Sequence, residues 1–460
     1  MAIYSNYKKI LVLLGDVLLV FSAFFMAVYI KVIASQLFSF EFVLSRVNWV
    51  IVLWLFSCPV IFYVFELYNE SRWRHNVRLL SNIALAVLVT AAIIAFLSFF
   101  FLPNIVIGRK VILLYILFVI PLLFCWRKLL FRVFLQNGAN QQKILLIGES
   151  PIIEDLKSLV PNSDIGIMTA IGDYSENPGA ICINGSKSAK SLSDFVRESQ
   201  TNTLVVADRL KNLPLLRKEL LDLRFAGVAI YDAPLFYETL TGKVPVTRVT
   251  DSWFLFRNQG DIFNPDVYRK IKKIIDKVFA LIGIVLSCPL MLLAALAIKL
   301  TSKGPAFFKQ ERLSQNERPF TLIKFRTMID NAEKLTGPKW ASEDDPRITE
   351  VGRFLRKSRL DELPQFFNIL KGDMSFVGPR PIRKQVADML AKEFPYYRLR
   401  FTVKPGLTGW AQVRGDYAGS KKGQFEKLQY DLYYVQNQSI LFDLFIILKT
   451  VQTVIFRPGV

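Results

Sequence analysis

The sequence predicts a chain of three parts: an α-helical bundle of four transmembrane helices, a Rossmann-like α/β domain, and a second α/β domain that carries a re-entrant membrane helix. Three observations support this. Apolar residues make up 52% and charged residues 21% of the 460 residues, a balance too apolar for a wholly soluble protein. Long apolar runs fill the first 135 residues. Beyond them, strand-like and helix-like patterns alternate, and we place the three parts at residues 1–135, 141–260 and 266–460.

The charge balance predicts anionic partners. The 58 Lys and Arg residues exceed the 38 Asp and Glu residues by 20, which in an apolar chain is typical of contact with phospholipid head groups, phosphorylated substrates or nucleic acid. The 4 cysteines lie far apart, and His75 is the single histidine. Cysteine and histidine therefore cannot build a structural zinc site, and a Ser-His-Asp triad would depend on His75. The lack of a disulfide framework indicates that the polar parts face a reducing cytosol.

Each of four apolar runs in the first part is long enough to cross about 30 Å of hydrocarbon as a helix. The runs are Ile10–Ile33, Val47–Leu67, Leu79–Leu102 and Val111–Phe131. Lys and Arg are more numerous before the first run, between the second and third, and at the end of the fourth. The positive-inside rule therefore places the N-terminus and everything after Phe134 in the cytoplasm. Asp16 lies inside the first run, and we expect it to face the bundle interior. A transporter would need a charged partner for Asp16, and the sequence shows no evident one.

Residues 141–260 alternate short apolar strands with helical patterns, which predicts a small parallel βαβ sheet. The predicted strands are Lys143–Ile147, Ile165–Ile171, Thr203–Ala207 and Val228–Tyr231, and the predicted helices are Pro151–Val160, Leu192–Ser199 and Leu213–Phe225. The first turn has Gly148, but Ser150 and Ile153 stand where a dinucleotide-binding loop has its second and third glycines. We therefore expect a structural module, followed by a linker over Asp251–Pro265.

The third part opens with a basic run and continues into the apolar stretch Val278–Ile298. Positive charge flanks both ends of this stretch, so the positive-inside rule favours neither exit. Pro289 lies near its centre, in the segment Ser287-Cys288-Pro289, and removes a backbone hydrogen bond. A kinked re-entrant helix over about residues 274–300, which enters and leaves the same leaflet, accounts for both facts and keeps the rest of the chain in the cytoplasm.

The apolar tail Ile440–Phe456 carries Asp443, Lys449 and Gln452. A helix crossing the membrane would bury these polar groups, whereas a helix lying in the membrane interface need not. We therefore expect an interfacial helix.

Two adjacent acids, Asp361 and Glu362, precede a helical pattern that ends at Gly372. Because free amides and the helix dipole favour carboxylates there, the spacing alone is most simply explained by a helix cap. The many basic residues nearby favour a second interpretation, in which one carboxylate attacks phosphorus, the other holds Mg²⁺, and arginines bind phosphate oxygens. Arg380 between two prolines and the alternating segment Lys324-Phe325-Arg326 stand out among these basic residues.

Six motifs of the third part resemble, in the same order, those of the bacterial sugar transferase, or monotopic phosphoglycosyl transferase, family. They are Gly304–Arg312 (GPAFFKQER), Lys324–Met328 (KFRTM), Asp345–Thr349 (DPRIT), Leu360–Gln365 (LDELPQ), Gly378–Pro381 (GPRP) and Lys404–Trp410 (KPGLTGW). The resemblance covers about residues 266–456. The four membrane runs, the Rossmann-like module and the segment Pro234–Glu238 resemble the long-form members, the polyprenyl glycosylphosphotransferases of exopolysaccharide and O-antigen synthesis.

The resemblance implies an enzyme that transfers a sugar-1-phosphate from a UDP-sugar to undecaprenyl phosphate and releases UMP. It implies that Asp361 is the nucleophile, through a covalent phosphosugar intermediate, and that Glu362 helps to hold the cofactor Mg²⁺. The residues matched to binding are Arg356 and Arg380 for the phosphosugar and Lys324 and Arg326 for the nucleotide. Ser287 and Pro289 match the break in the family's re-entrant helix.

The same resemblance implies a multi-pass protein of the bacterial inner membrane with its catalytic domain on the cytoplasmic face. We expect a homodimer whose partners are a UDP-sugar, undecaprenyl phosphate and membrane lipid, and we expect no nucleic acid. A rival of another class is a non-catalytic membrane sensor that reads a nucleotide, which would need the glycine-rich loop this sequence lacks. Arg414–Lys422 is longer and more polar than the family's usual tail, so the sequence leaves the sugar and the glycan open.

Overall fold

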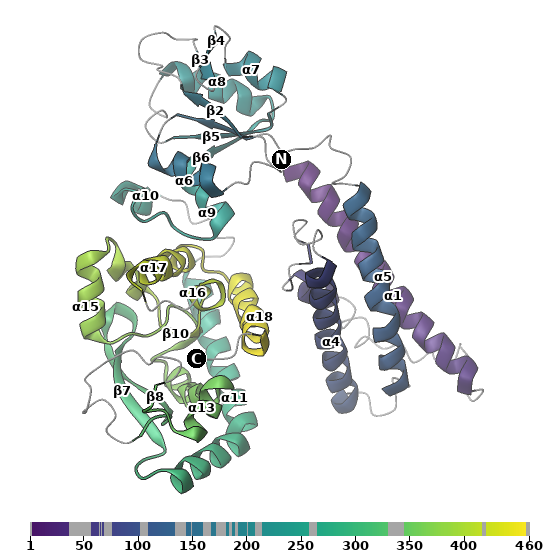
Figure 1. The fold of residues 1–460 in the computed structure, drawn as a ribbon, viewed down its shortest axis with the longest axis vertical. Helices are drawn as coiled ribbons and strands as arrows, with labels where there is room; N and C mark the ends of the chain where they lie inside the picture. The colour runs from purple at the N-terminus through teal and green to yellow at the C-terminus, as the bar shows by residue number, and fades with distance from the viewer. Residues whose placement is uncertain are drawn as a thin grey trace. The chain divides into compact units, whose positions relative to one another are not determined.

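We describe the fold from a computed structural model of the chain (Figure 1). The described residues are 2–35, 57–63, 65, 67–68, 76–101, 109–133, 144–148, 150–159, 167–171, 181–183, 186–188, 192–199, 201–207, 214–256, 265–329, 345–415 and 420–456. The chain divides into two compact units, which we treat separately. The first is Met1–Gly148 with Lys157–Tyr231, and the second is Glu149–Leu156 with Asp232–Val460.

Long apolar helices dominate the described residues of the N-terminal part: α1 (Ala2–Ser35), α4 (Asn76–Phe101) and α5 (Arg109–Phe131) (Figure 1). α5 packs against both of the others. α1 and α5 contain stretches long and apolar enough to cross a membrane, and α4 contains a shorter apolar stretch. Most of the predicted second run, Val47–Leu67, lies outside the described residues, although residues 57–63 are helical. The chain is thus a membrane protein, and the count of four crossings stays a prediction.

Asp16 has a buried partner in this part of the chain. Its two carboxylate oxygens each accept a hydrogen bond of 2.6 Å from the guanidinium of Arg127 on α5. Both side chains are buried, and Arg127 Nε also donates to the carbonyl of Leu67 at 3.1 Å. The expectation that Asp16 faces the bundle interior is confirmed. The expectation that it lacks a partner was wrong, because Arg127 stands among the basic residues that end the fourth run and the sequence does not show that it turns inward.

The Rossmann-like part is a six-stranded sheet in the order β4-β3-β2-β1-β5-β6. Its strands are β1 (Ile144–Ile147), β2 (Ile167–Ile171), β3 (Ile181–Ile183), β4 (Ser186–Ser188), β5 (Thr203–Val206) and β6 (Ala229–Asp232). The helices that alternate with these strands along the chain are α6 (Pro151–Leu159), α7 (Leu192–Ser199) and α8 (Pro214–Phe225). β1 pairs in parallel with β2 and β5, so the predicted parallel arrangement is confirmed. The antiparallel strands β3 and β4 were not predicted.

Buried apolar residues of β1, β5, α7 and α8 form the core of this sheet. β1 and β5 are buried along their whole length, which explains why β1 is entirely apolar and β5 is apolar except for Thr203. β3 (Ile-Cys-Ile) and β4 (Ser-Lys-Ser) are three residues each, which is too short to give a clear alternating pattern, and β4 is polar throughout.

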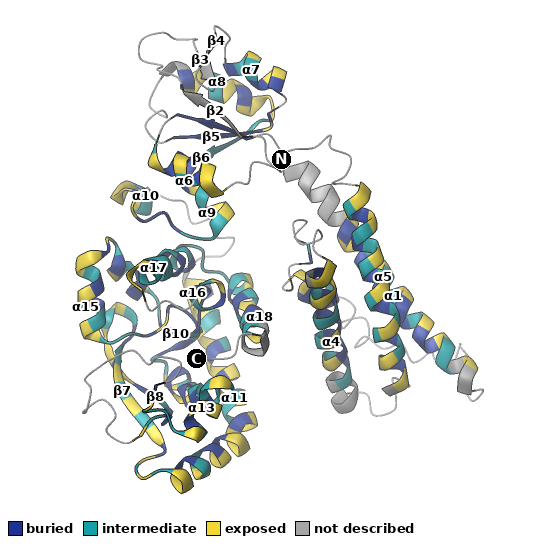
Figure 2. Cartoon of the chain, in the orientation of Figure 1, coloured by how far each residue is buried: buried dark blue, intermediate teal, exposed yellow. Residues whose placement is uncertain are grey.

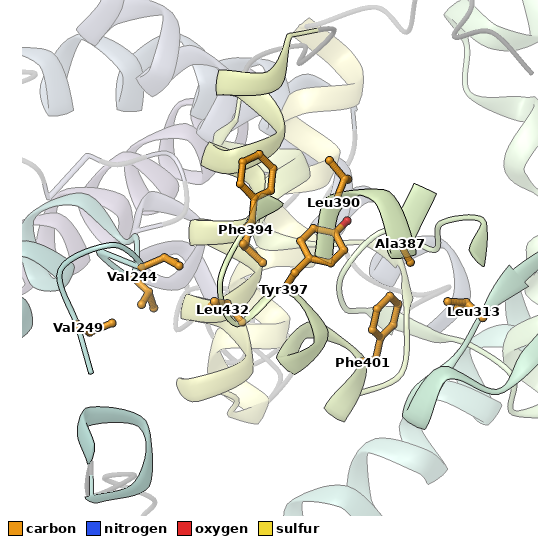
Figure 3. Close-up of a cluster of buried hydrophobic side chains, with 11 residues drawn as sticks. Val244, Val249, Leu313, Ala387, Leu390, Phe394, Tyr397, Phe401 and Leu432 are labelled. Atoms are coloured by element: carbon orange, nitrogen blue, oxygen red, sulfur yellow. The ribbon is translucent and has the colours of Figure 1, made fainter. Parts of the chain in front are cut away.

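Besides Glu149–Leu156, the second unit contains the whole chain from Asp232 onward, including residues ahead of position 266. The segment after β6 forms α9 (Ala233–Thr241) and α10 (Asp251–Phe256), and it packs into the C-terminal core. Val244 and Val249 belong to the same buried cluster as Phe394 and Leu432 (Figure 3). The interval from Asp251, predicted as a linker, thus starts with a helix. Its aromatic residues pack on the cluster, which no local pattern reveals.

Polar contacts hold the same segment in place. The indole N–H of Trp410 donates to the carbonyl of Gly242 at 2.8 Å, and Lys243 forms a 2.5 Å ion pair with Glu426. The backbone N–H of Val244 donates to the carbonyl of Gln429 at 3.1 Å. This segment is therefore a structural part of the C-terminal unit.

The second unit also contains two small sheets and a set of helices. The hairpin is β7 (Phe307–Leu313) with β8 (Pro319–Phe325), and a parallel pair is β9 (Ser375–Val377) with β10 (Gly406–Thr408). The helices are α11 (Pro265–Thr301), α13 (Glu350–Lys357), α14 (Gln365–Lys371), α15 (Lys384–Glu393), α16 (Trp410–Arg414), α17 (Lys421–Gln436) and α18 (Ile440–Phe456). Short 3-10 turns are η4 (Gln315–Glu317), η5 (Leu360–Glu362) and η6 (Tyr397–Thr402).

α11 is the long apolar helix of this unit. Its 37 residues include Pro289, and the helix assignment continues through Ser287, whose hydroxyl donates to the carbonyl of Gly283 at 2.5 Å. Figure 1 shows the helix changing direction along its length, and Figure 2 shows exposed residues over most of it. The exposed side chains are largely apolar from Ile274 to Leu300, and the helix is long and apolar enough to cross a membrane. Re-entry into one leaflet stays a prediction.

α18 confirms the predicted helix over Ile440–Phe456. Asp443 is 8% exposed and accepts hydrogen bonds from Tyr268 (2.9 Å), Lys272 (2.5 Å) and Tyr434 (2.7 Å). The sequence treated Asp443 as a charge that must avoid the membrane. The structure shows instead that it is neutralised within the protein, where it ties α18 to α11 and α17.

Candidate active site

Asp361 and Glu362 lie in the 3-10 turn η5, between α13 and α14. Leu360 and Leu363, on either side of the acids, pack against a buried cluster of residues from α11, β8 and α13. Arg359 adopts the left-handed conformation with φ of 56°, which turns the chain sharply after α13. The flanking leucines therefore anchor the turn, and the Asp361 side chain is left 8% exposed.

The predicted helix after the acids is confirmed as α14, and Gly372 ends it with φ of 96°. Its N-cap position is Pro364, and no side chain caps it. The acids therefore do not cap this helix, and the helix-cap interpretation was wrong. The reason is that η5 is a separate turn, which places the two carboxylates one turn before the helix begins.

Burial and the neighbouring Glu362 charge raise the pKa of Asp361 to about 6, against the opposing effect of Lys324, Arg380 and Arg356. Burial would also raise the pKa of Glu362, but the charges of Arg380, Arg359 and Lys324 outweigh it and hold the pKa below its usual value. Arg380 contributes most because its guanidinium donates to Glu362 Oε1 at 2.9 Å. The two adjacent acids are thus pushed apart in pKa, which is typical of catalytic carboxylates.

The three cations that act on Asp361 come from separate elements. Lys324 lies on β8, where burial lowers the pKa of its ammonium below the usual value despite the opposing effect of the Asp361 charge. Arg356 is on the last turn of α13, and its Nε donates to Thr327 Oγ1 at 2.9 Å. We call the group of Asp361, Glu362, Lys324, Arg356 and Arg380 the Asp361 cluster. It unites five of the six residues that the sequence assigned to catalysis or substrate binding.

Arg326, the sixth of these residues, directs its guanidinium to the segment that follows α11. Its two terminal nitrogens donate to the carbonyls of Lys303 (2.8 Å) and Ser302 (3.1 Å) and to the Ser302 hydroxyl (2.7 Å). The side chain is 6% exposed. Adjacent strand residues point to opposite faces, so Lys324 and Arg326 share a face only while β8 continues, and β8 ends at Phe325. Arg326 therefore closes the C-terminal end of α11.

A tight turn after β9 presents Arg380. The N–H of Gly378 donates to the carbonyl of Thr408 at 2.9 Å, and the N–H of Gly406 donates to the carbonyl of Pro379 at 3.0 Å. A Cβ on Gly378 would lie 2.3 Å from the carbonyl oxygen of Lys404, so only glycine fits there. The GPRP and KPGLTGW motifs thus pack against each other, and their backbone hydrogen bonds hold the turn that carries Arg380.

We expect Gly378→Ala to lower both the stability of the C-terminal unit and the reaction rate. The new methyl group would force β9 and β10 apart and shift the Arg380 turn, at a cost of about 1–3 kcal/mol. Thermal unfolding and turnover would be measured on the full chain. Gly227→Ala is the control, because its left-handed φ of 93° is strained but no atom lies within 4 Å of the new Cβ. Equal turnover in both variants would contradict the proposed role of the turn.

Two buried residues behind this turn were missed by the sequence. Arg400 is 5% exposed, donates to the carbonyl of Arg380 at 3.1 Å, and forms a 2.7 Å ion pair with Asp431. Arg400 and Asp431 are positioning residues for Arg380, and nothing in the sequence links the two. Arg359 was not singled out from the sequence either. Its left-handed backbone is strained for a residue other than glycine, a feature that tends to occur at functional sites.

The bacterial sugar transferase family model matches residues 267–457, and a CoA-binding domain model matches residues 63–231. The UDP-glucose:undecaprenyl-phosphate glucose-1-phosphate transferase of Caulobacter vibrioides is 43% identical over 188 residues, which are 40% of this chain and 69% of that protein. The chain belongs to the bacterial sugar transferase family. All five residues of the Asp361 cluster lie within the matched range of the family model.

Longer members of the bacterial sugar transferase family are matched over a smaller share. The UDP-N-acetylgalactosamine-undecaprenyl-phosphate N-acetylgalactosaminephosphotransferase of Aeromonas hydrophila is 42% identical over 235 residues, 51% of this chain and 54% of that protein. The UDP-glucose:undecaprenyl-phosphate glucose-1-phosphate transferase of Escherichia coli is 40% identical over 190 residues, 40% of each chain. The match thus spans about half the length of these relatives or less.

In this bacterial sugar transferase, the Asp361 cluster has the groups for phosphoryl chemistry: a buried carboxylate, a second ionised carboxylate and three cations. Within the described residues, no group of three or more His, Cys, Asp and Glu side chains could hold a metal ion. Mg²⁺ is commonly held by one or two carboxylates together with substrate phosphates. The two acids therefore fit Mg²⁺ that is shared with a bound diphosphate, and they do not form a closed metal cage.

Proposed function

We propose that the chain transfers a sugar-1-phosphate from a UDP-sugar to undecaprenyl phosphate and releases UMP. The observation that carries the proposal is the buried Asp361 carboxylate, whose pKa is raised to about 6 amid Lys324, Arg356 and Arg380. Family membership and the activities named for the relatives support the same reaction. The product would start the assembly of an exopolysaccharide or an O-antigen.

The proposed reaction has two displacements at phosphorus. In the first, an Asp361 oxygen attacks the sugar-bearing phosphorus of the UDP-sugar, the bond to the bridging oxygen breaks, and UMP leaves with that oxygen. In the second, an oxygen of undecaprenyl phosphate attacks the carboxyl phosphate, which yields the lipid diphosphate sugar and restores Asp361. Lys324, Arg356 and Arg380 would bind the phosphate oxygens as charge is redistributed. A covalent intermediate of this kind predicts ping-pong kinetics.

Glu362 would hold Mg²⁺ together with the phosphate oxygens of the substrate. The metal, when bound, would neutralise charge on the diphosphate. Arg380 keeps Glu362 ionised through its 2.9 Å hydrogen bond, so the acid is ready to bind a cation at neutral pH. Glu362→Gln should therefore weaken the Mg²⁺ dependence of turnover as well as its rate.

UMP release with a panel of UDP-sugars and undecaprenyl phosphate tests the proposal. Glucose, galactose and N-acetylated amino sugars are the first candidates, and we expect one of them to give UMP only when Mg²⁺ is present. The rival proposal, a non-catalytic sensor that reads a nucleotide, predicts nucleotide binding without UMP release. Binding of a UDP-sugar with no UMP formed across the panel would favour that rival.

We expect kcat/KM to rise with pH up to a pH of about 6 and then level off. The pKa of Asp361 is raised to about 6, so below this pH the carboxyl group is protonated and cannot attack. Below a pH of about 6, kcat/KM should fall about tenfold for each pH unit. UMP release at low UDP-sugar concentration would be followed between about pH 5 and pH 8. Enzyme held at the lowest pH and assayed at neutral pH controls for inactivation, and a flat profile would contradict the assignment.

The same proposal includes a membrane arrangement. The exposed apolar length of α11, with Pro289 inside and lysines at both ends, supports a re-entrant helix in one leaflet, and α18 would lie in the membrane interface. Four further helices would cross the bacterial inner membrane, with both α/β parts in the cytoplasm. The homodimer expected from the resemblance would be measured by mass photometry of the full chain in detergent.

A further inference from the structure

A basic cavity of about 510 Å³ lies in the second unit, between the N-terminal half of α11, the segment after η6 and the C-terminal end of α17. Its charged lining residues are Arg269, Lys272, Lys273, Asp276 and Lys404. No residue of the Asp361 cluster lines it. Four cations and one acid are therefore gathered around a space that the proposed reaction does not use.

Two of these charged groups are already engaged inside the protein. The Lys272 ammonium donates to Asp443 Oδ2 at 2.5 Å and to the Tyr434 hydroxyl at 3.2 Å. Asp276 accepts a hydrogen bond of 3.1 Å from the backbone N–H of Phe376. These contacts fix the walls of the cavity, and they neutralise Lys272.

The other cations have little compensation. Arg269 forms a 3.5 Å ion pair with Asp266, and both side chains are exposed. Among the described residues, Lys273 and Lys404 form no ion pair. Burial lowers the pKa of Lys404, and the charges of Lys273 and Lys277 lower it further, against the partial compensation of Asp276. Like charges are thus held together around one space, an arrangement that an anion would stabilise.

The position of the cavity along α11 indicates which anion it meets. Lys273 is followed directly by Ile274, which is 63% exposed, and then by Val278, Phe279 and Leu281, all about half exposed or more. If this apolar length lies in a membrane, the lysine side chains lie at the level of the lipid head groups. We propose that the basic cavity binds the phosphate group of an anionic membrane lipid. The inference rests on the membrane position of α11 in the proposed function, but not on the transfer reaction.

Native mass spectrometry of the full-length chain in a neutral detergent tests the proposal, with dioleoyl phosphatidylglycerol and dioleoyl phosphatidylcholine as probes. We expect phosphatidylglycerol to bind at least about tenfold more tightly, because only its head group carries a net negative charge. Lys273→Gln with Lys404→Gln should lower that affinity about tenfold or more through the loss of two charge-assisted contacts. Equal binding of the two lipids, or no loss in the variant, would overturn the proposal.

Lys270→Gln with Lys392→Gln is the matched control. It also removes two positive charges, from exposed residues of α11 and α15 that do not line the cavity, and should bind phosphatidylglycerol like the unmodified chain. Equal losses in both variants would reduce the effect to net charge and overturn the site. Inorganic phosphate is the third probe. If it occupies the cavity and phosphatidylglycerol is not preferred, the lipid assignment fails. No UDP-sugar is present, so failure here leaves the UMP-release test unaffected.

Discussion

Asp361→Asn should abolish UMP release, with a loss of about a thousandfold or more, and should also abolish any radiolabelled phosphosugar adduct on the chain. The amide keeps the shape of the side chain but has no carboxylate oxygen to attack phosphorus. The full chain in nanodiscs would be incubated with UDP-sugar labelled in its sugar phosphate, and both the adduct and UMP would be counted. Full turnover in the variant would show that Asp361 is not the nucleophile.

We also expect Asp361→Asn to change the stability of the chain, and measuring this change would show that the inactive variant is folded. The pKa of Asp361 is raised to about 6, so the folded chain binds the proton more tightly than the unfolded chain. This contribution to stability is present at low pH and is lost as the pH rises through about 6, where the buried carboxylate becomes charged. Because a neutral amide avoids the loss, Asp361→Asn should raise Tm at neutral pH. The corresponding gain in the free energy of unfolding is at most about 2–3 kcal/mol. The gain should vanish near pH 4.

Arg127→Ala should destabilise the membrane helices by about 3–5 kcal/mol, because it leaves the Asp16 carboxylate buried without its partner. The two side chains are almost completely buried and share two hydrogen bonds of 2.6 Å. Thermal unfolding in detergent and the yield of folded protein would measure the loss. Arg132→Ala is the matched control, since it removes one positive charge from the exposed residue five positions later.

A double replacement separates the pair from the packing around it. Asp16→Leu with Arg127→Met removes both charges and keeps apolar volume, so it should recover most of the stability that Arg127→Ala loses. A double variant as unstable as the single one would show that the Arg127 contacts with Leu67 and Tyr68, and not the charge of Asp16, hold these elements together.

Local patterns in the sequence located much of the fold. β1 and β5 are fully buried and correspondingly rich in apolar residues, and α14 ends at a glycine whose left-handed conformation disfavours other residues. Short polar strands such as β4 and segments such as α10 were missed. Their stability comes from contacts with distant parts of the chain, and their own residues show no clear period.

Some residues of the candidate site could be found from the sequence, and others could not. The sequence identified Asp361 and Glu362, because two acids stand beside many basic residues. The family resemblance matched Arg326 to the nucleotide, whereas the structure engages its guanidinium at the end of α11. Arg400 and Asp431 were missed because an ion pair between residues 31 positions apart leaves no local pattern.

By itself, the sequence predicted the membrane character of the chain, the parallel sheet and the acid pair at the centre of a basic region. These features depend on composition and on neighbours within a few residues. Only the tertiary structure decided that the segment from Asp232 belongs to the C-terminal unit and that Asp16 pairs with Arg127. It also placed some of the cations in separate groups: a buried partner for Asp16, the cations around Asp361 and the cations of the basic cavity. The reason is physical: the sign of a charge can be read from the sequence, but its partner and its degree of burial are set by residues far away in the chain.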